Sequence, residues 1–277
     1  MKSRPFRIWV TVAALFGSAS ASFSLPPCSQ KGMNKWHLCE GIFIENGDAF
    51  KGQFINNQKS GMGKYTWKNG DTFLGNYKND KKNGSGLYTY STGETFEGEF
   101  LNGMSHGRGT YTFSDGSKFI GSYNEGQRTG PGKIYFKDGS FFDGEYLRGA
   151  RTGFGVFVFS NGDKYQGHWE DNKQEGQGVY TWATGDTYSG GWKKGIKAGH
   201  GSFSYANGSY FFGDFHNDLK EGWGFYLGQN GYAELCEYSL NEIVKCLNSD
   251  IHKGFLVLET VFKSYSANER KTIQSKL

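Results

Sequence analysis

The chain has 277 residues, a formal net charge of +4 and an aromatic content of 17%, with 43 glycines and four cysteines. Its first 21 residues hold three of the 31 basic residues and none of the acidic ones, so the remainder has a net charge of +1. A chain this close to neutral lacks the strong basic excess that is typical of nucleic-acid-binding proteins, which argues against nucleic acid as a general partner.

Residues 1–21 have the pattern of a secretory signal peptide. Lys2, Arg4 and Arg7 form a positive region, residues 8–16 form a short apolar stretch, and residues 19–21 (Ala-Ser-Ala) offer a small-residue cleavage site. The apolar stretch is shorter than the roughly 20 residues that cross a bilayer. We therefore predict an exported protein, periplasmic or extracellular and compatible with envelope association. Retention of the segment as an uncleaved anchor is the alternative.

Residues 22–47 are predicted to form an N-terminal cap with half a repeat, and residues 48–231 form eight units of 23 residues without insertion or deletion. One offset is always aromatic: Phe50, Phe73, Phe96, Phe119, Phe142, Tyr165, Tyr188 and Phe211. Another is always glycine: Gly61, Gly84, Gly107, Gly130, Gly153, Gly176, Gly199 and Gly222. This period indicates a stacked array in which each unit leans on its neighbours.

Within a unit, alternating side chains predict two strands. In the third unit Phe96 and Phe100 alternate with Glu97 and Glu99, which is strand periodicity with the aromatics on one face. A second strand over 109–113 repeats the alternation. Closing Asn-Gly or Asp-Gly pairs predict type I′ hairpin turns. Glycine between the two aromatics of the first strand predicts a core of rings placed over glycine gaps.

The third unit reads FEGEFLNGMSHGRGTYTFSDG over 96–116. This pattern resembles the MORN (membrane occupation and recognition nexus) repeat, and the resemblance covers about residues 48–231. Ile134 and Gly228 depart from it by replacing usual aromatics. The resemblance implies a mainly β fold: an elongated, twisted array of antiparallel β-hairpins. It also implies scaffolding, dimer formation and membrane-linked locations as expected roles.

Residues 232–277 change character and are predicted to form a small helical C-terminal cap. Residues 239–242 (Ser-Leu-Asn-Glu) have a capping-box pattern. Apolar residues then follow helical spacing: Leu240, Ile243, Val244 and Leu247. A second apolar run at 255–262 fits helix or strand, and another capping box opens a polar helix over 266–277. Residues 268–277 also resemble the opening helix of a small peptidoglycan-binding domain.

The four cysteines fall in two local pairs outside the array: Cys28 with Cys39, and Cys236 with Cys246. In an exported protein an even number of cysteines indicates disulfides. Three connectivities are open, and the local pairing is the simplest. A metal site is disfavoured because the chain has no Cys-x-x-Cys motif.

No pattern of catalytic residues is evident. The six histidines share no repeat offset and form no His-Glu-x-x-His motif. The glycine-rich Gly61-Met62-Gly63-Lys64 has neither the Gly-Lys-Ser/Thr ending nor the strand-loop-helix context of a phosphate loop. Carboxylate pairs such as Glu97 and Glu99 are absent from most other units. We therefore predict no enzyme activity, no cofactor and no metal.

Two surface features are candidate binding sites. One loop offset carries a row of basic residues, which could contact an anionic membrane or cell-wall surface: Lys59, Lys82, Arg128, Arg151, Lys197 and Lys220. Ser105 and Gln174 interrupt this row. A solubilising role for the loops is the simpler interpretation.

The second feature is a file of neutral, mostly β-branched residues on the non-aromatic face: Thr66, Thr89, Thr112, Tyr135, Val158, Thr181, Ser204 and Leu227. Such a file stabilises a sheet in any case, and it also suits a flat contact with another protein. The favoured prediction is a non-enzymatic scaffold at a cell envelope that binds protein partners or itself. The alternatives are attachment through the basic row and, least favoured, an enzyme using the C-terminal region.

Overall fold

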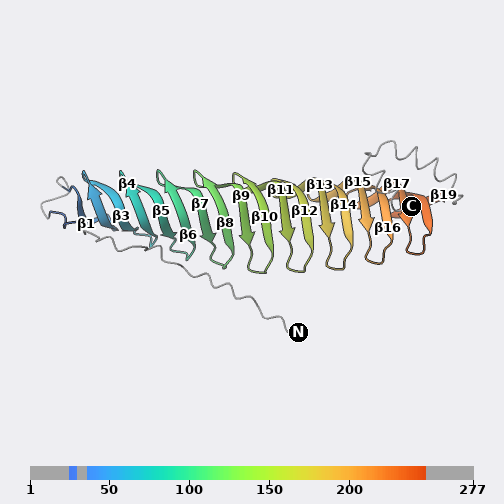
Figure 1. Ribbon diagram of the computed structural model, residues 1–277, viewed down its shortest axis with the longest axis horizontal. Coiled ribbons are helices and arrows are strands. Elements are labelled where there is room, and N and C mark those ends of the chain that lie inside the picture. Colours follow the sequence, from blue (N-terminus) through green and yellow to red (C-terminus); the bar gives the residue numbers. More distant parts are fainter. Residues whose placement is uncertain (1–24, 30–35, 248–277) are drawn as a thin grey trace, which may run out of the picture.

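A computed structural model describes residues 25–29 and 36–247. These residues form one antiparallel sheet of 19 strands in chain order, each paired with the next, in an elongated array (Figure 1). The strands are β1 (Cys39–Glu45), β2 (Asp48–Ile55), β3 (Gln58–Thr66), β4 (Thr72–Lys78), β5 (Lys81–Thr89), β6 (Thr95–Leu101), β7 (Met104–Thr112), β8 (Lys118–Asn124), β9 (Gln127–Tyr135), β10 (Phe141–Leu147), β11 (Ala150–Val158), β12 (Lys164–Glu170), β13 (Lys173–Thr181), β14 (Thr187–Lys193), β15 (Ile196–Ser204), β16 (Tyr210–His216), β17 (Leu219–Leu227), β18 (Ala233–Ser239) and β19 (Glu242–Leu247).

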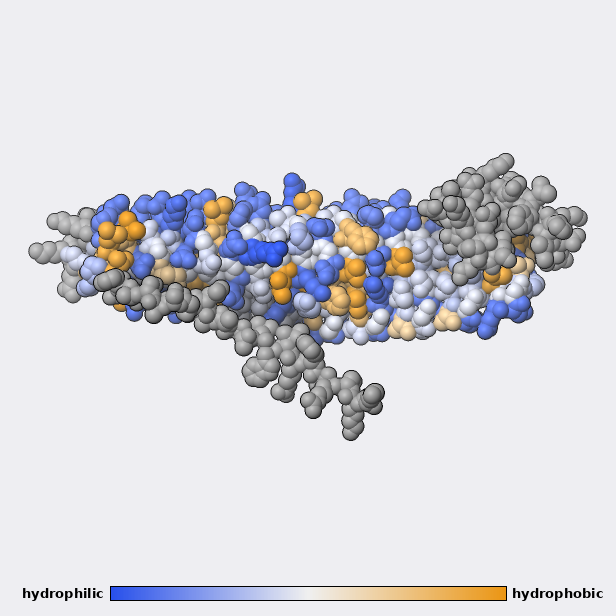
Figure 2. All heavy atoms as spheres, in the orientation of Figure 1, coloured by the Kyte–Doolittle hydropathy of each residue, from blue (hydrophilic) through white to orange (hydrophobic). Residues whose placement is uncertain are grey.

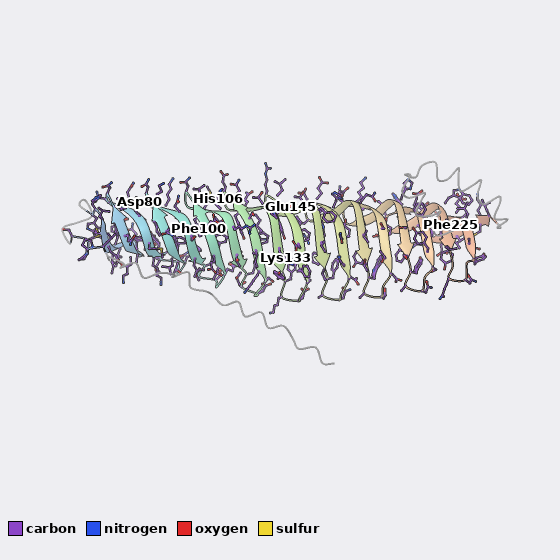
Figure 3. The ribbon with its side chains drawn as sticks, viewed as in Figure 1. Asp80, Phe100, His106, Lys133, Glu145 and Phe225 are labelled. Atoms are coloured by element: carbon purple, nitrogen blue, oxygen red, sulfur yellow. A yellow bond between two sulfur atoms is a disulfide. The ribbon has the colours of Figure 1, made fainter. Side chains whose placement is uncertain are left out.

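Each repeat is a hairpin with a two-residue turn. Both turn residues have positive φ, as at Asn79 (50°) and Asp80 (66°), which is the type I′ pattern. Asp80 lies at the sheet edge formed by these turns (Figure 3). The type I′ chemistry that we expected in the closing pairs therefore occurs in the inner loops.

The closing turns between repeats are of a different type. Gly70 has φ of 92°, while Asn69 is not left-handed. The Gly70 amide donates to the Trp67 carbonyl, and the Trp67 amide donates to the Asp71 carbonyl. A three-residue connection with one left-handed glycine needs no positive φ at Asn69. The prediction of type I′ geometry at these pairs was therefore wrong, although the prediction of a turn was right.

The core consists of aromatic rings placed over glycines, as predicted. In the third repeat Gly98 lies opposite Gly109 across β6 and β7. A Cβ added at Gly98 would be 2.6 Å from the Gly109 Cα and 2.9 Å from Cζ of Phe96. The ring of Phe96 fills the space that side chains would otherwise occupy. It also meets Phe100 edge to face at 5.2 Å, an arrangement that aromatic pairs favour.

Polar contacts join consecutive repeats at both edges of the sheet. At the short-turn edge the Lys59 amide donates to the Asp80 carboxylate at 2.8 Å, and the Asp80 amide donates back to the Lys59 carbonyl. At the other edge the Tyr65 hydroxyl donates to Asp48 at 2.8 Å, and the Lys68 amide donates to the same carboxylate. These hydrogen bonds hold the pKa of Asp48 below its usual value. Side chains thus join several consecutive repeats in addition to strand pairing, and where glycine replaces Asp80 the backbone bond alone remains, as between Gly103 and Lys82.

The first strand is covered at its outer edge. Pro27 forms a parallel bridge with Glu40, and the Cys28 amide donates to the Glu40 carbonyl. A disulfide joins Cys28 to Cys39. Because an unpaired strand edge can recruit other strands, this segment partly protects the start of the array.

The C-terminal end differs from the helical cap that we predicted. Residues 242–247 form strand β19, which pairs with β18 through the turn residues Leu240 and Asn241, both with positive φ. The second disulfide joins Cys236 and Cys246, which are direct partners in this hairpin. The capping box at 239–242 is therefore a hairpin turn. The predicted signal peptide (1–21) and the elements predicted at 255–262 and 266–277 lie outside the described residues.

Candidate binding faces

The strands have two chemically different faces. We call the face that carries Phe50 and its equivalents at 23-residue steps the aromatic face, and the face that carries Thr66 and its equivalents the opposite face. Rings on the aromatic face form a continuous chain of contacts: Phe73 meets Tyr77 of its own repeat at 5.4 Å and Phe100 of the next at 4.8 Å. This face is therefore closed over most of its length by its own side chains.

The predicted row of basic residues lies on the aromatic face. Strand pairing places each member opposite a ring, as with Lys82 opposite Tyr77. The Lys82 ammonium is 4.4 Å from the ring centre of Tyr88, 5.2 Å from Phe100 and 5.6 Å from Phe73. The other five make the same kind of contact: Lys59, Arg128, Arg151, Lys197 and Lys220. The structure therefore brings all six into one file, seated on rings.

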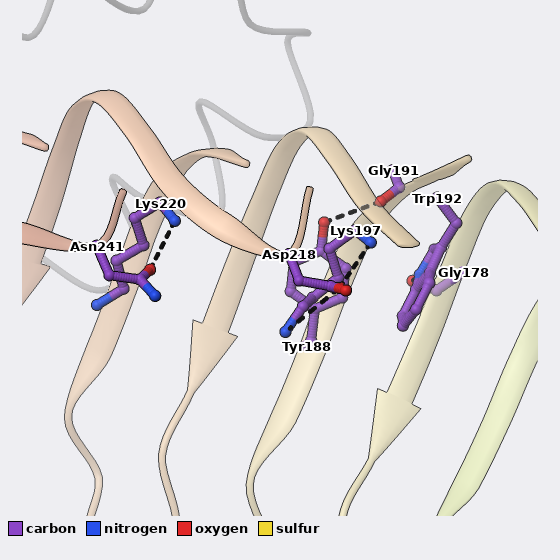
Figure 4. Close-up of polar contacts among 8 residues, drawn as sticks. All are labelled: Gly178, Tyr188, Gly191, Trp192, Lys197, Asp218, Lys220 and Asn241. Carbon is purple, nitrogen blue, oxygen red and sulfur yellow. Dashed lines mark hydrogen bonds and ion pairs between the residues drawn. The ribbon is translucent and has the colours of Figure 1, made fainter. Parts of the chain in front are cut away.

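Burial affects the ionisation of this row. Loss of hydration lowers the pKa values of Lys82, Arg151, Lys197 and Lys220. The Lys197 ammonium is 4.0 Å from the Asp218 carboxylate, as Figure 4 shows. Within the described part of the chain, Lys197 is the one member of the row within 4.0 Å of a carboxylate. Most of the basic side chains on this face thus contact aromatic rings rather than carboxylates.

The threonine file lies on the opposite face and forms a cross-strand ladder. Thr66 pairs with Thr72, Thr72 with Thr89, and Thr89 with Thr95. Thr95 then pairs with Thr112. Further along the same line stand Tyr135, Val158 and Thr181. The file is half-buried over most of its length, while Tyr135 is 43% exposed.

Beside this ladder, the opposite face exposes large apolar side chains that we had not singled out from the sequence. Along their strands these residues alternate with residues of the aromatic face: Ile42, Ile44, Met62, Leu74, Leu87, Ile120, Phe154 and Val179. Leu74 is 48% exposed and Phe154 is 52% exposed. In the view of Figure 2 apolar side chains stand in separate patches among hydrophilic ones along the array. For Leu74 and Ile120 the signal in the sequence was an apolar residue directly after the first aromatic of the unit, Phe73 or Phe119.

The opposite face has a small core of its own at the C-terminal end. Phe225 and Leu235 are cross-strand partners and are both buried. Trp223, Leu227 and Ala233 pack against them. Phe225 is labelled in Figure 3, near the end of the array. The eight apolar side chains named above are therefore exposed between β1 and β13, whereas Phe225 and Leu235 near the last repeat are buried.

Groups with catalytic or metal-binding chemistry are sparse in the described part of the chain. Glu234, Cys236 and Cys246 lie close enough together to form a metal site. However, both sulfurs are committed to the disulfide, so they are not available as thiolate ligands. His200 contacts Asp214 on the opposite face. Within residues 25–29 and 36–247 no helix has the length and apolarity needed to cross a membrane.

The solved structures that match this chain have low similarity to it. The TCP10 domain of Danio rerio CPAP, in complex with a peptide of Danio rerio STIL, is 14% identical with a TM-score of 0.45, covering 75% of this chain and 93% of that chain. The TCP domain of Drosophila melanogaster SAS-4, in complex with a proline-rich motif of Ana2, is 12% identical with a TM-score of 0.36, covering 64% and 90%. No curated protein matches the chain.

A family model gives a clear result. The MORN repeat model matches eight consecutive segments of the chain: 50–72, 73–95, 96–118, 119–141, 142–164, 165–187, 188–210 and 211–231. These segments follow the 23-residue period and extend from β2 to the closing turn after β17. The chain therefore belongs to the MORN repeat family.

Proposed function

We propose that this protein is a non-enzymatic scaffold whose opposite face binds a protein partner or a second copy of the chain. The observation that carries the proposal is the file of exposed apolar side chains on that face, including Leu74, Ile120 and Phe154. Exposed apolar patches that are rimmed by polar residues are a feature of interaction sites. These side chains are also dispensable for the core, since the rings on the aromatic face supply it.

The mechanism is rigid presentation. The repeats are held by strand pairing, by ring contacts and, at many junctions, by polar contacts at the edges, so the opposite face keeps its shape without a partner. A partner then loses little binding energy to ordering the surface that it meets. The threonine ladder adds hydroxyl groups beside the apolar side chains, a mixture suited to a contact that stays soluble when unoccupied.

We place this function in an exported compartment at a cell envelope. The predicted signal peptide supports export, and the two disulfides are compatible with an oxidising environment. Secretion of the chain with its N-terminus cleaved after Ala21 is the expected result of expression in a host with a matching export system. Intact residues 1–21 on a cell-associated product would instead support the uncleaved anchor.

The scaffold proposal is tested with a matched pair of double variants. Leu74→Lys with Ile120→Lys places two charges on the opposite face. Leu38→Lys with Leu240→Lys places two charges on similarly exposed leucines at the ends of the array. Affinity capture from detergent-solubilised envelope and light scattering report a partner or a dimer. We expect the first variant to lose either species and the second to retain it. Equal behaviour of both variants, or a wild-type monomer that captures nothing, contradicts the proposal.

A second candidate function, attachment to an anionic surface, is favoured by the single file of basic side chains with one carboxylate partner. It is tested by sedimentation with anionic vesicles. The variant replaces Lys59, Lys82, Arg128 and Arg151 with Gln. The control replaces four opposite-face lysines with Gln: Lys51, Lys64, Lys118 and Lys133. Selective loss of salt-sensitive binding in the first variant supports attachment, and unchanged binding contradicts it.

A further inference from the structure

Two repeats have no cation where their neighbours have one: Gln174 stands at this offset in the sixth repeat, and the much shorter Ser105 stands there in the third. Lys82 and Arg151 each stand over rings at three equivalent positions: the first aromatic of the first strand, an aromatic of the second strand, and the second aromatic of the following repeat's first strand. For Arg151 these rings are Phe142, Phe157 and Trp169, with centres at 5.4, 5.4 and 4.6 Å from Cζ. We call this three-ring arrangement the ring cage.

The third repeat builds the same ring cage from Phe96, Tyr111 and Tyr123. Ser105 stands at the cation's offset, directly opposite Phe100. A serine side chain is too short to reach the rings, and a cavity of about 300 Å³ lies there. The cavity is also lined by Tyr88, Tyr90 and Lys82. Its volume is at the lower end of the range for ligand sites, roughly 300–1,000 Å³.

The chemistry of the lining favours a cation. The faces of aromatic rings carry partial negative charge and attract ammonium and guanidinium groups. Burial raises the pKa of Tyr111 to about 12 and also raises that of Tyr123, so both phenols stay neutral. No carboxylate lines this cavity within the described residues. Rings without acids suit a weakly hydrated organic cation better than a metal ion.

We propose that the ring cage at Ser105 binds an organic cation, either a free quaternary ammonium compound or the side chain of a lysine or arginine from a bound protein. The chain itself supplies the precedent, because the same ring cage is occupied by Lys82 in the preceding repeat and by Arg151 two repeats further along. The site is independent of the opposite-face scaffold, since it lies on the other side of the sheet.

Repulsion from Lys82, which lines the cavity, does not prevent binding. Consecutive repeats elsewhere carry consecutive cations, as with Lys197 and Lys220. Two strands separate such neighbours, which corresponds to roughly 9–10 Å. That distance is about one Debye length at physiological ionic strength. A cation bound at Ser105 would lie at the same distance from Lys82.

The test uses tetramethylammonium as the probe and saturation-transfer NMR on the purified full chain. We expect transfer from aromatic protons to the probe's methyl groups in the wild type and in Ser105→Ala. Ser105→Lys should fill the ring cage with its own ammonium and weaken binding by at least about tenfold, while thermal unfolding stays at or above the wild-type temperature. Thr110→Lys adds the same charge to the opposite face and should leave binding unchanged.

The outcomes separate the sources of the cation. Binding of tetramethylammonium that is displaced by a lysine-containing peptide supports a ring cage open to partner side chains. Binding without such displacement supports a small free cation. Equal transfer in the wild type and in Ser105→Lys, or transfer to acetate instead of the ammonium probe, overturns the proposal.

Discussion

The two faces of this sheet are built from adjacent residues of the same strands, yet they obey different constraints. In β8, Phe119 is 0% exposed, whereas the next residue, Ile120, is 49% exposed. Phe119 has a glycine pair beneath it and rings of two repeats around it. Ile120 has cross-strand neighbours on a face open to solvent. One face thus fixes the fold, while the other is free to carry a function.

The comparison explains the unequal regularity of the repeat. Positions on the aromatic face must accept a ring, a glycine or a cation in a fixed geometry, so their side chains hardly vary along the chain. Positions on the opposite face range from Lys64 and Leu74 to Glu97 and Thr110, which stand along one line of cross-strand pairs. Their variety indicates that the array tolerates different chemistries there.

Alkaline pH should have the largest effect, and it should act through the aromatic face. Burial raises the pKa values of Tyr65, Tyr111 and Tyr146 to about 12. A folded-state pKa above the usual value of 10 stabilises the fold fully below pH 10 and loses that contribution as the pH rises toward 12. We expect cooperative unfolding in this range, measured by circular dichroism alongside tyrosinate absorbance.

The control for this experiment is Tyr146→Phe. The Tyr146 hydroxyl is buried and has no hydrogen-bond partner among the described residues. Its removal should shift the alkaline transition to higher pH without destabilising the protein at neutral pH. An unchanged alkaline transition in Tyr146→Phe, or a wild-type fold that is intact at pH 12, would show that tyrosine ionisation does not limit stability at alkaline pH.

Truncation of neighbouring residues should give the sharpest contrast between the faces. Phe119→Ala removes a fully buried ring and should lower the free energy of unfolding by about 3–5 kcal/mol. Ile120→Ala, one position away, should change it by less than about 0.5 kcal/mol, as is usual at a surface site. Urea titration of both variants measures the difference. Similar losses at the two positions would show that the opposite face also carries the core.

Addition of one methyl group should test the glycine gaps. Gly98→Ala places a Cβ against the Gly109 backbone and the ring of Phe96, and this overpacking should cost about 1–3 kcal/mol. Thr110→Val, on the opposite face of the partner strand, adds no new clash and serves as the control. Urea denaturation reports both. A neutral Gly98→Ala would mean that the ring can move aside, which would contradict a tightly packed core.

The sequence was informative where one physical rule repeats eight times. Alternation around Phe96 predicted the strands and the aromatic face, and spacing alone favoured the local cysteine pairs that the structure contains. We did not predict the exposed apolar side chains of the opposite face. Each of them occupies one strand position between aromatic and glycine residues that recur in every unit, and those recurring residues dominate the sequence pattern.

The error at the C-terminal end arose from a conflict between local and repeat signals. Residues 239–242 match a capping box, which favours a helix when considered alone. In the 23-residue period, however, Asn241 takes the place of Asn57 eight repeats later, in the second position of a type I′ turn. The aromatic and glycine markers have become Glu234 and Lys245, so the ninth hairpin no longer resembles the others in sequence.

The orientation of the basic row could not be predicted, because it depends on the register after a turn. Lys82 directly follows the first residue of β5, where the sequence indicates a loop, but pairing with Tyr77 turns its side chain onto the rings. Register at a bulged hairpin is set by backbone geometry around a left-handed glycine, such as Gly84 with φ of 90°. The ring cage at Ser105, which has no basic side chain of its own, could be recognised only once this orientation was known.

The smallest effect is predicted for two neighbouring lysines of β5, Lys82 on the aromatic face and Lys81 on the opposite face. Lys82→Met keeps the apolar stem but removes the charge from the rings, and should cost about 0.5–1 kcal/mol. Loss of hydration, which lowers the pKa of Lys82, opposes the ring attraction and keeps the expected cost small. Lys81→Met, at an exposed neighbouring position, should be neutral within about 0.5 kcal/mol. Thermal unfolding of both at neutral pH measures this. Stabilisation by Lys82→Met would show that desolvation outweighs the ring contacts, and that the basic row is maintained for binding rather than for stability.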